Sequence, residues 1–250
     1  VCSSDLLTII ILLLSIFTYG QGKKFGITLQ VSSPSDDNVK LGWFNIDQES
    51  KDGYNLKHRS FAGGFLANYN INNETTLRLR FGITKYFIDE YGDINLNGIL
   101  YSISAKGKQN KIHFAPGIIW NMHMNKLNLF GGFELPINFH GEFTFDNISI
   151  SKDSLTGNII SDRQIKTTLP KGNSFGIGAI MGFNYFPANW FSLGAEFSPS
   201  LLYAKLSGKT TTVSIDNLTP ANSNTSYTQE EDKGFTFYDQ RFSINFSIWF

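Results

Sequence analysis

The chain has 250 residues and a formal charge of zero, with 21 basic and 21 acidic side chains. This balance, without a basic stripe, excludes an electrostatic case for nucleic-acid binding. Only 17% of the residues are charged and 15% are aromatic, whereas a soluble domain usually carries about a quarter charged residues. The mean hydropathy is nevertheless slightly negative, which argues against a bundle of membrane helices. Few charges, many aromatics and a neutral average favour a transmembrane β-barrel, in which apolar and polar residues alternate.

The first feature along the chain is the apolar run LLTIIILLLSIF at positions 6–17. Twelve residues are too few to cross a hydrocarbon core of about 30 Å as a helix, but they suit a secretory signal. We therefore expect a signal peptide over residues 1–21, with a truncated or non-native start. The lone Cys2 precedes the run, so it is not placed as a lipoprotein acceptor. The processed chain would contain no thiol.

From residue 22 onward, apolar and polar residues alternate with a period of two, as half-buried strands require. The last segment shows this best, because its large apolar residues alternate with Ser243, Asn245 and Ser247. The apolar residues of that segment are Phe242, Ile244, Phe246, Ile248 and Phe250. The same pattern predicts eight strands, at about 24–32, 58–71, 75–88, 110–124, 127–145, 172–186, 190–206 and 236–250.

The connections between these strands alternate between short and long. Tight turns are expected at 72–74, 125–126 and 187–189, where turn-forming residues occur. Long polar loops are expected at about 33–57, 89–109, 146–171 and 207–235. This alternation is typical of a transmembrane barrel, with short periplasmic turns and long extracellular loops. We therefore predict an all-β fold over residues 22–250, an eight-stranded antiparallel up-and-down transmembrane β-barrel with both termini in the periplasm.

A soluble β-sandwich is the alternative fold. It would also alternate, but its outward face should be charged. Here the face opposite the large apolar residues carries mainly Gly, Ser, Asn and Ala, which suits the narrow lumen of an eight-stranded barrel. Lys85 faces the lipid by parity, near the outer surface, where its amine can reach the headgroup region.

The final strand carries a family resemblance. Outer-membrane barrels commonly end in Phe preceded by alternating apolar residues, as in the segment from Phe242 to Phe250. With the apolar leader and eight strands, the chain resembles small OmpA/OmpX-like barrels and, more narrowly, the Bacteroidota outer-membrane barrels called PorT-like. The resemblance implies outer-membrane lipid as surroundings and recognition of this segment by the barrel-assembly machinery. The resemblance implies no specific activity, since a fold does not fix function. We expect a structural, adhesion or secretion-associated role, with an extracellular or secretion-system protein as partner.

Several charged residues share the lumen-facing parity at middle heights. Charges in a narrow, low-dielectric lumen must pair to offset the loss of hydration, so we expect a salt-bridged plug. Its expected members are Arg78, Arg80, Glu134, Glu196, Asp239 and Arg241. A gate, a proton path or a narrow pore is the functional alternative.

The sequence offers little chemistry beyond this cluster. The four histidines, at positions 58, 113, 123 and 140, have no metal-ligand spacing, and no metal or other cofactor is expected. His140 with Glu142 could be interpreted as the rim pair of a lipid-modifying enzyme. Adjacent polar residues at a barrel rim are far more often simply solvated, so we expect no enzyme; a lipid-modifying enzyme remains the alternative.

Overall fold

The computed structural model describes residues 24–32 and 54–250, which form one antiparallel sheet of eleven strands. The signal peptide expected at 1–21 lies outside the described residues. Helix in the described part is limited to one 3₁₀ turn, η1 (Pro220–Asn222), and no helix there has the length and apolar character needed to cross a bilayer. The strands are β1 (Phe25–Ser32), β2 (Tyr54–Asn70), β3 (Thr75–Leu96), β4 (Ile99–Met124), β5 (Leu127–Glu134), β6 (Ile137–His140), β7 (Phe143–Asp153), β8 (Ile159–Leu169), β9 (Gly172–Ala188), β10 (Phe191–Asp216) and β11 (Asn224–Trp249).

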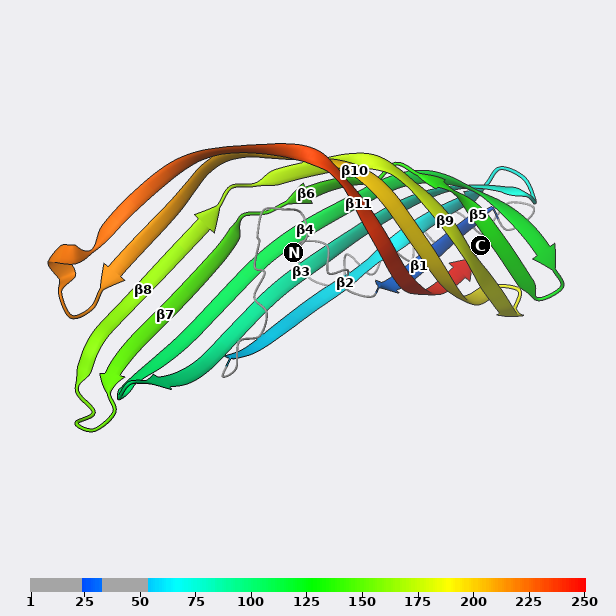
Figure 1. Ribbon diagram of the computed structural model, residues 1–250. Coiled ribbons are helices and arrows are strands. Elements are labelled where there is room, and N and C mark those ends of the chain that lie inside the picture. Colours follow the sequence, from blue (N-terminus) through cyan, green and yellow to red (C-terminus); the bar gives the residue numbers. More distant parts are fainter. Residues whose placement is uncertain (1–23, 33–53) are drawn as a thin grey trace, which may run out of the picture.

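Antiparallel ladders connect these strands into a closed ring of eight positions. The ring runs β1, β2, β3, β4, then β5 followed by β6, then β9, β10 and β11, and β11 pairs with β1 again. Figure 1 shows this ring at the end where β1 and the C-terminus lie. The all-β antiparallel barrel expected from the alternation is thereby confirmed.

The ring is not closed along its whole height. The described ladders of β1 end at Ser32, which pairs with Ala62 of β2 and Ser243 of β11. Both neighbours continue past this point, β2 towards Tyr54 and β11 towards Asn224. Beyond the level of Ser32, on the side away from the C-terminus, the described sheet is therefore an open, curved extension rather than a closed barrel.

The predicted count of eight strands is wrong for the sheet as a whole, for two physical reasons. Pro136 divides the predicted fifth strand, since proline has no N–H for the ladder; β5 ends at Glu134 and β6 begins at Ile137. The second reason is a further hairpin at the predicted loop 146–171: β7 begins at Phe143, separate from β6, and β8 lies inside the predicted loop and pairs with both β7 and β10.

Three of the predicted long loops are likewise mostly strand. The segments 89–109, 146–171 and 207–235 prolong the hairpins β3/β4, β7/β8 and β10/β11 well beyond the ring, as Figure 1 shows. The first hairpin turns at Asn97 and Gly98, whose φ angles are +52° and +80°. Such Asn-Gly pairs favour two-residue turns between strands because both residues tolerate positive φ. The fourth predicted loop lies mainly in 33–53, outside the described residues.

The ring has a polar interior and an apolar exterior. Side chains of one parity on each strand are buried inside it and are largely polar: Thr28, Gln30, Asn68, Thr76, Arg80, His113, Glu134, Asn138, Asn184, Glu196 and Asn245. Those of the other parity are exposed and large: Leu29, Phe65, Leu79, Ile112, Phe133, Phe139, Ile177, Leu193 and Phe246. The cluster of buried apolar residues inside is small, Ile119 with Phe130 and Ile180.

Candidate functional site

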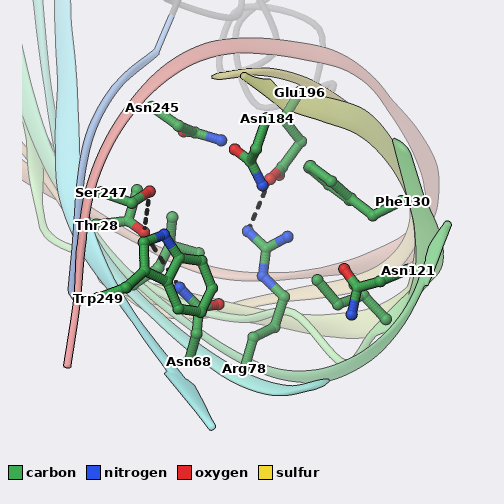
Figure 2. Close-up of a pocket in the computed structure, with 12 residues that line it drawn as sticks. Thr28, Asn68, Arg78, Asn121, Phe130, Asn184, Glu196, Asn245, Ser247 and Trp249 are labelled. Atoms are coloured by element: carbon green, nitrogen blue, oxygen red, sulfur yellow. Dashed lines mark hydrogen bonds and ion pairs between the residues drawn. The ribbon is translucent and has the colours of Figure 1, made fainter. Parts of the chain in front are cut away.

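The central feature of the lumen is an ion-pair cluster formed by Arg78 and Arg80 of β3, Glu134 of β5 and Glu196 of β10. In the ring of eight positions, β3 and β10 lie four places apart, on opposite walls. Arg78 crosses the lumen and donates from Nη2 to Oε2 of Glu196 at 2.7 Å, and Figure 2 shows this contact along the barrel axis. The cluster therefore bridges the lumen rather than following its wall.

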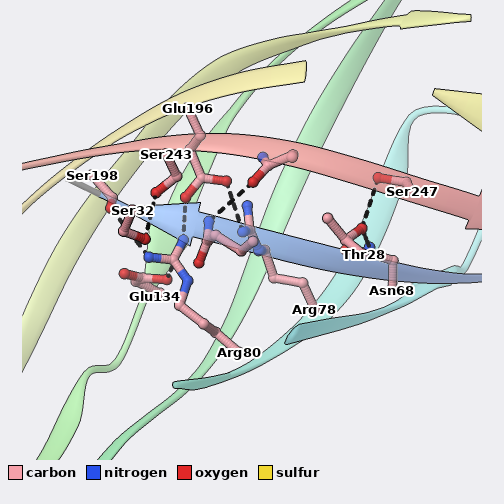
Figure 3. Close-up of polar contacts among 12 residues, drawn as sticks. Thr28, Ser32, Asn68, Arg78, Arg80, Glu134, Glu196, Ser198, Ser243 and Ser247 are labelled. Carbon is pink, nitrogen blue, oxygen red and sulfur yellow. Dashed lines mark hydrogen bonds and ion pairs between the residues drawn. The ribbon is translucent and has the colours of Figure 1, made fainter. Parts of the chain in front are cut away.

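Arg80 completes the cluster. Its Nη2 donates to Oε1 of Glu196 and lies 3.2 Å from Oε2 of Glu134, while Nη1 donates to Ser198 Oγ at 3.2 Å (Figure 3). One carboxylate, that of Glu196, thus accepts from both guanidinium groups. Two positive and two negative charges balance, as burial of all four side chains requires.

Four of the six residues predicted for the cluster are therefore brought together in the lumen. The side chains of Asp239 and Arg241 lie outside the described part of the chain, so their membership stays a prediction. Ser198, which sequence reasoning missed, is a fifth member. The sequence did contain a signal for it: Ser198 lies two residues after Glu196 on β10 and therefore faces the same side of the strand.

On the side of the tight turns, hydrogen-bonded hydroxyls and amides line the wall of the lumen. Thr76 Oγ1 donates to Asn70 Oδ1 at 2.6 Å, Asn121 Nδ2 donates to Thr76 Oγ1 at 2.8 Å, and Asn128 Nδ2 donates to Asn121 Oδ1 at 2.9 Å. This chain of contacts links β2, β3, β4 and β5 from inside. The neutral side chains exchange hydrogen bonds with one another, so their burial leaves these groups satisfied.

A second chain of contacts joins the strands at the seam of the ring. Thr28 and Ser247 hydroxyls lie 2.8 Å apart, and Asn68 Nδ2 donates to Thr28 Oγ1 at 3.1 Å. Gln30 Nε2 donates to Asn245 Oδ1 at 3.1 Å. These contacts tie β11 to β1 and β1 to β2 from the inside.

The hollow left between the turn-side hydrogen bonds and the ion pairs is small. It measures about 20 Å³ and is bounded by residues including Asn68, Arg78, Glu196 and Trp249 (Figure 2). One ordered water needs at least about 10–15 Å³ of such space. The hollow therefore has room for about one water molecule and is too small for a solute.

On the other side of the ion pairs, histidines and small polar residues from β4, β6 and β9 form a buried group. His113 Nδ1 lies 2.6 Å from Asn138 Oδ1, and Asn138 Nδ2 donates to Ser174 Oγ at 2.9 Å. Ser174 Oγ also lies 3.2 Å from His140 Nε2. Lys111, which is fully buried, lies opposite His140 in the β4–β6 ladder. Sequence reasoning noted the histidines but not this group, although lumen-facing parity would have placed its members.

The structure separates the two residues considered for an enzyme. His140 points inward to Ser174, whereas Glu142 is exposed and its Oε1 lies 4.0 Å from Lys171 Nζ. Among the residues that the structure describes, no group of three or more His, Cys, Asp or Glu side chains could hold a metal ion.

The residues of the predicted assembly signal lie along β11 and just after it. Phe242, Ile244, Phe246 and Ile248 are all exposed on the outer face. Phe250 follows the strand, and its N–H donates to Phe25 O at 2.8 Å. One face therefore presents these apolar side chains together, while their recognition by the assembly machinery stays a prediction.

Comparisons with known proteins give only distant likenesses. No known protein family and no curated protein sequence matches the chain. Among solved structures, Neisserial surface protein A is 13% identical with a TM-score of 0.35, and a major outer membrane protein from Thermus thermophilus is 12% identical with a TM-score of 0.37. Acinetobacter baumannii CarO is 8% identical with a TM-score of 0.34. Each alignment covers 92% of this chain and all of the other.

Proposed function

We propose that this protein is an integral outer-membrane β-barrel with a closed lumen and a structural or interaction role. The observation that carries the proposal is the reversed polarity of the ring. Its buried interior holds Arg, Glu, His and Asn, while its exterior carries Leu, Ile, Phe and Val.

Exposing an apolar surface of this kind to water would cost free energy. Leu29 is 60% exposed and Phe65 49%, and apolar residues of the same parity follow one another along every ring strand. Exposed apolar area costs about 25 cal/mol per Å² in water, and soluble monomers rarely expose apolar patches beyond a few hundred Å². The same side chains carry no such cost in hydrocarbon, so this exterior is suited to a lipid bilayer.

The arrangement of the connections supports an orientation. β1 begins and β11 ends at the end of the ring that carries the tight turns after Asn70, Met124 and Ala188. The long hairpins β3/β4, β7/β8 and β10/β11 extend from the opposite end. In outer-membrane barrels the short turns are periplasmic and the long connections extracellular. We place the three hairpins outside the cell and the tight turns in the periplasm.

The ion pairs support a closed lumen. Arg78 and Arg80 reach across the barrel to Glu196, and the hollow beneath them has room for about one water molecule. An eight-stranded barrel has an interior just wide enough for its side chains. The narrow-pore alternative would need these pairs to separate.

An interaction role is favoured by the hairpins beyond the ring. They expose Leu155, 93% accessible at the β7/β8 turn, together with Ile159, Ile160 and Tyr227. Contiguous exposed apolar patches mark surfaces that bind other molecules, and Leu155, Ile159 and Ile160 lie on one hairpin. We infer a protein partner outside the cell, or in a secretion apparatus, rather than a purely mechanical role.

Refolding of residues 22–250 into lipid vesicles tests the location. We expect a protease-resistant form that migrates differently on a gel before and after heating. A chain that stays monomeric in water without detergent would refute the membrane barrel. Planar-bilayer recordings test the lumen separately: we expect no steady current, and a large steady current would refute closure while leaving the barrel intact.

A further inference from the structure

The outer face of β2 and β3 carries a groove within the apolar exterior. It measures about 450 Å³ and is lined by Gly63, Gly64, Phe65, Phe81, Ile83 and Lys85. Gly63 pairs with Ile83 across the ladder, and Phe65 with Phe81. Because Gly63 has no side chain where its neighbours carry large ones, the exterior is hollowed between the two strands.

The groove runs from apolar residues to a positive charge. Phe65 and Phe81 are in ring contact at 5.3 Å between centroids. Lys85, exposed on the same face, is the last residue of the lining. It lies about ten residues along β3 from the tight turn, which is the length a tilted strand needs to cross a bilayer. On the proposed function, its amine is therefore at the outer surface of the hydrocarbon.

A second lysine lies beside this end of the groove. Lys85 pairs with Asn110 on β4, and Lys108 is two residues further along the same exposed face. Diagonal neighbours on adjacent strands are about 7–8 Å apart at the backbone. The amines of two long lysine side chains at this spacing can therefore reach one anion. Lys106, the next exposed lysine on β4, lies opposite Asp89 of β3 and Asp146 of β7 in the two ladders.

We propose that this groove binds one acyl chain of a phosphate-bearing membrane lipid, with the phosphate held by Lys85 and Lys108. The inference rests on the proposed membrane location and adds a specific lipid site to it. The apolar lining accounts for the chain, and the two cations at its end account for the anionic headgroup. The barrel exterior thereby prefers one lipid class at one place.

The test uses the folded chain in detergent micelles and native mass spectrometry. Three probes separate the two halves of the site: dipalmitoyl phosphatidic acid, dipalmitoylglycerol without phosphate, and glycerol 3-phosphate without acyl chains. We expect one retained phosphatidic acid, about tenfold weaker retention of dipalmitoylglycerol, and no competition by glycerol 3-phosphate. Equal retention of the two lipids, or competition by glycerol 3-phosphate, would overturn the site.

Two variants and a matched control locate the binding. Lys85→Gln removes the charge and Gly63→Phe fills the groove, and each should weaken phosphatidic acid about tenfold. Lys126→Gln removes an exposed lysine at the opposite end of the barrel and should change nothing. If the first variants fail to fold, two others replace them. Lys108→Gln should weaken the retention of phosphatidic acid, and Lys85→Arg should preserve it. If retention in all folded variants equals that of the unmodified chain, the site is refuted, whereas a chain that never enters vesicles refutes the membrane location instead.

Discussion

Arg80 on β3 and Glu196 on β10 form an ion pair between opposite walls of the ring, and Arg78 donates to the same carboxylate. Glu196 is therefore the shared acceptor of both guanidinium groups, whereas Glu134 contacts Arg80 alone among the described pairs. The four side chains join three strands that are not neighbours in the ring. Such contacts supplement the ladders, which join only adjacent strands.

Loss of the Glu196 charge should therefore be more harmful than loss of the Glu134 charge. Glu196→Gln keeps the shape but leaves two buried guanidinium groups with one carboxylate, and breaking such a pair costs about 3–5 kcal/mol. Glu134→Gln should cost less. Urea-induced unfolding in lipid vesicles measures both. The exposed pair Lys205 and Glu231, 3.9 Å apart, provides a control, since Glu231→Gln should cost at most about 1 kcal/mol; equal effects at positions 196 and 231 would contradict the cluster's role.

Removal of the bridge should also open the lumen. In Arg80→Ala combined with Glu196→Ala, two buried side chains that cross the interior are lost, and the space becomes continuous with the hollow beneath. We expect a steady ion current in planar bilayers from this variant and none from the unmodified chain. The control Lys205→Ala with Glu231→Ala, which removes an exposed ion pair away from the lumen cluster, should conduct no more than the unmodified chain. An unaltered baseline in both variants would show that residues other than the ion pairs close the barrel.

Much of the ring was predictable because side chains along a strand point alternately to its two faces, and here one of the two faces is polar. Arg78, Arg80, Glu134 and Glu196 were placed in the lumen by parity alone, and they meet there. The contact partners were not predictable, because parity gives a face but not the stagger between strands. Only the ladder register brings Arg78 opposite Glu196 rather than another acidic residue.

The extensions beyond the ring were missed for a different reason. β8 (Ile159–Leu169) has no regular alternation, and its strand conformation follows from pairing with β7 and β10 on its two sides. The β3/β4 hairpin did carry a local signal, since Asn97-Gly98 is a strong turn pair between alternating residues. The polar composition of these segments predicts loops, although a strand beyond the closed ring can be polar on both faces.

Lumen-facing glycines should be less tolerant than glycines on the outer face. A Cβ on Gly182 would contact the Ala195 carbonyl oxygen and lie 2.6 Å from Phe130 Cζ, whereas on Gly131 its nearest contact would be 3.6 Å away. Overpacking typically costs about 1–3 kcal/mol, so Gly182→Ala should lower the free energy of unfolding by that amount. Gly131→Ala should be close to neutral in the same urea titration. Equal tolerance at both positions would contradict the packing of Phe130 against β9.

The β7/β8 turn should loosen only in acid. N–H groups of Thr156 and Leu155 donate to Asp153 Oδ1 at 2.7 and 2.9 Å and hold the Asp153 pKa below its usual value of 3.8. A lowered pKa in the folded state means that the contribution is present above the unfolded pKa and is lost as the pH falls through the folded one. The Thr156 amide resonance should therefore shift only below about pH 4. Asp153→Asn keeps an acceptor oxygen and should abolish the shift, so a shift that persists in this variant would assign the titration to another group.

A charge placed on the apolar exterior distinguishes a membrane barrel from a water-soluble one. Leu29, between Ile27 and Val31 on β1, is 60% exposed on the apolar exterior of the ring. An arginine at the bilayer midplane costs about 2–4 kcal/mol in a transmembrane barrel, so Leu29→Arg should destabilise the folded form in vesicles by that amount. Leu155→Arg, at the exposed β7/β8 turn, should leave the free energy of unfolding unchanged because that side chain would face water. In a soluble protein, both substitutions would replace an exposed apolar residue, and both should be neutral or improve solubility. That result would refute the assignment of the apolar exterior to lipid.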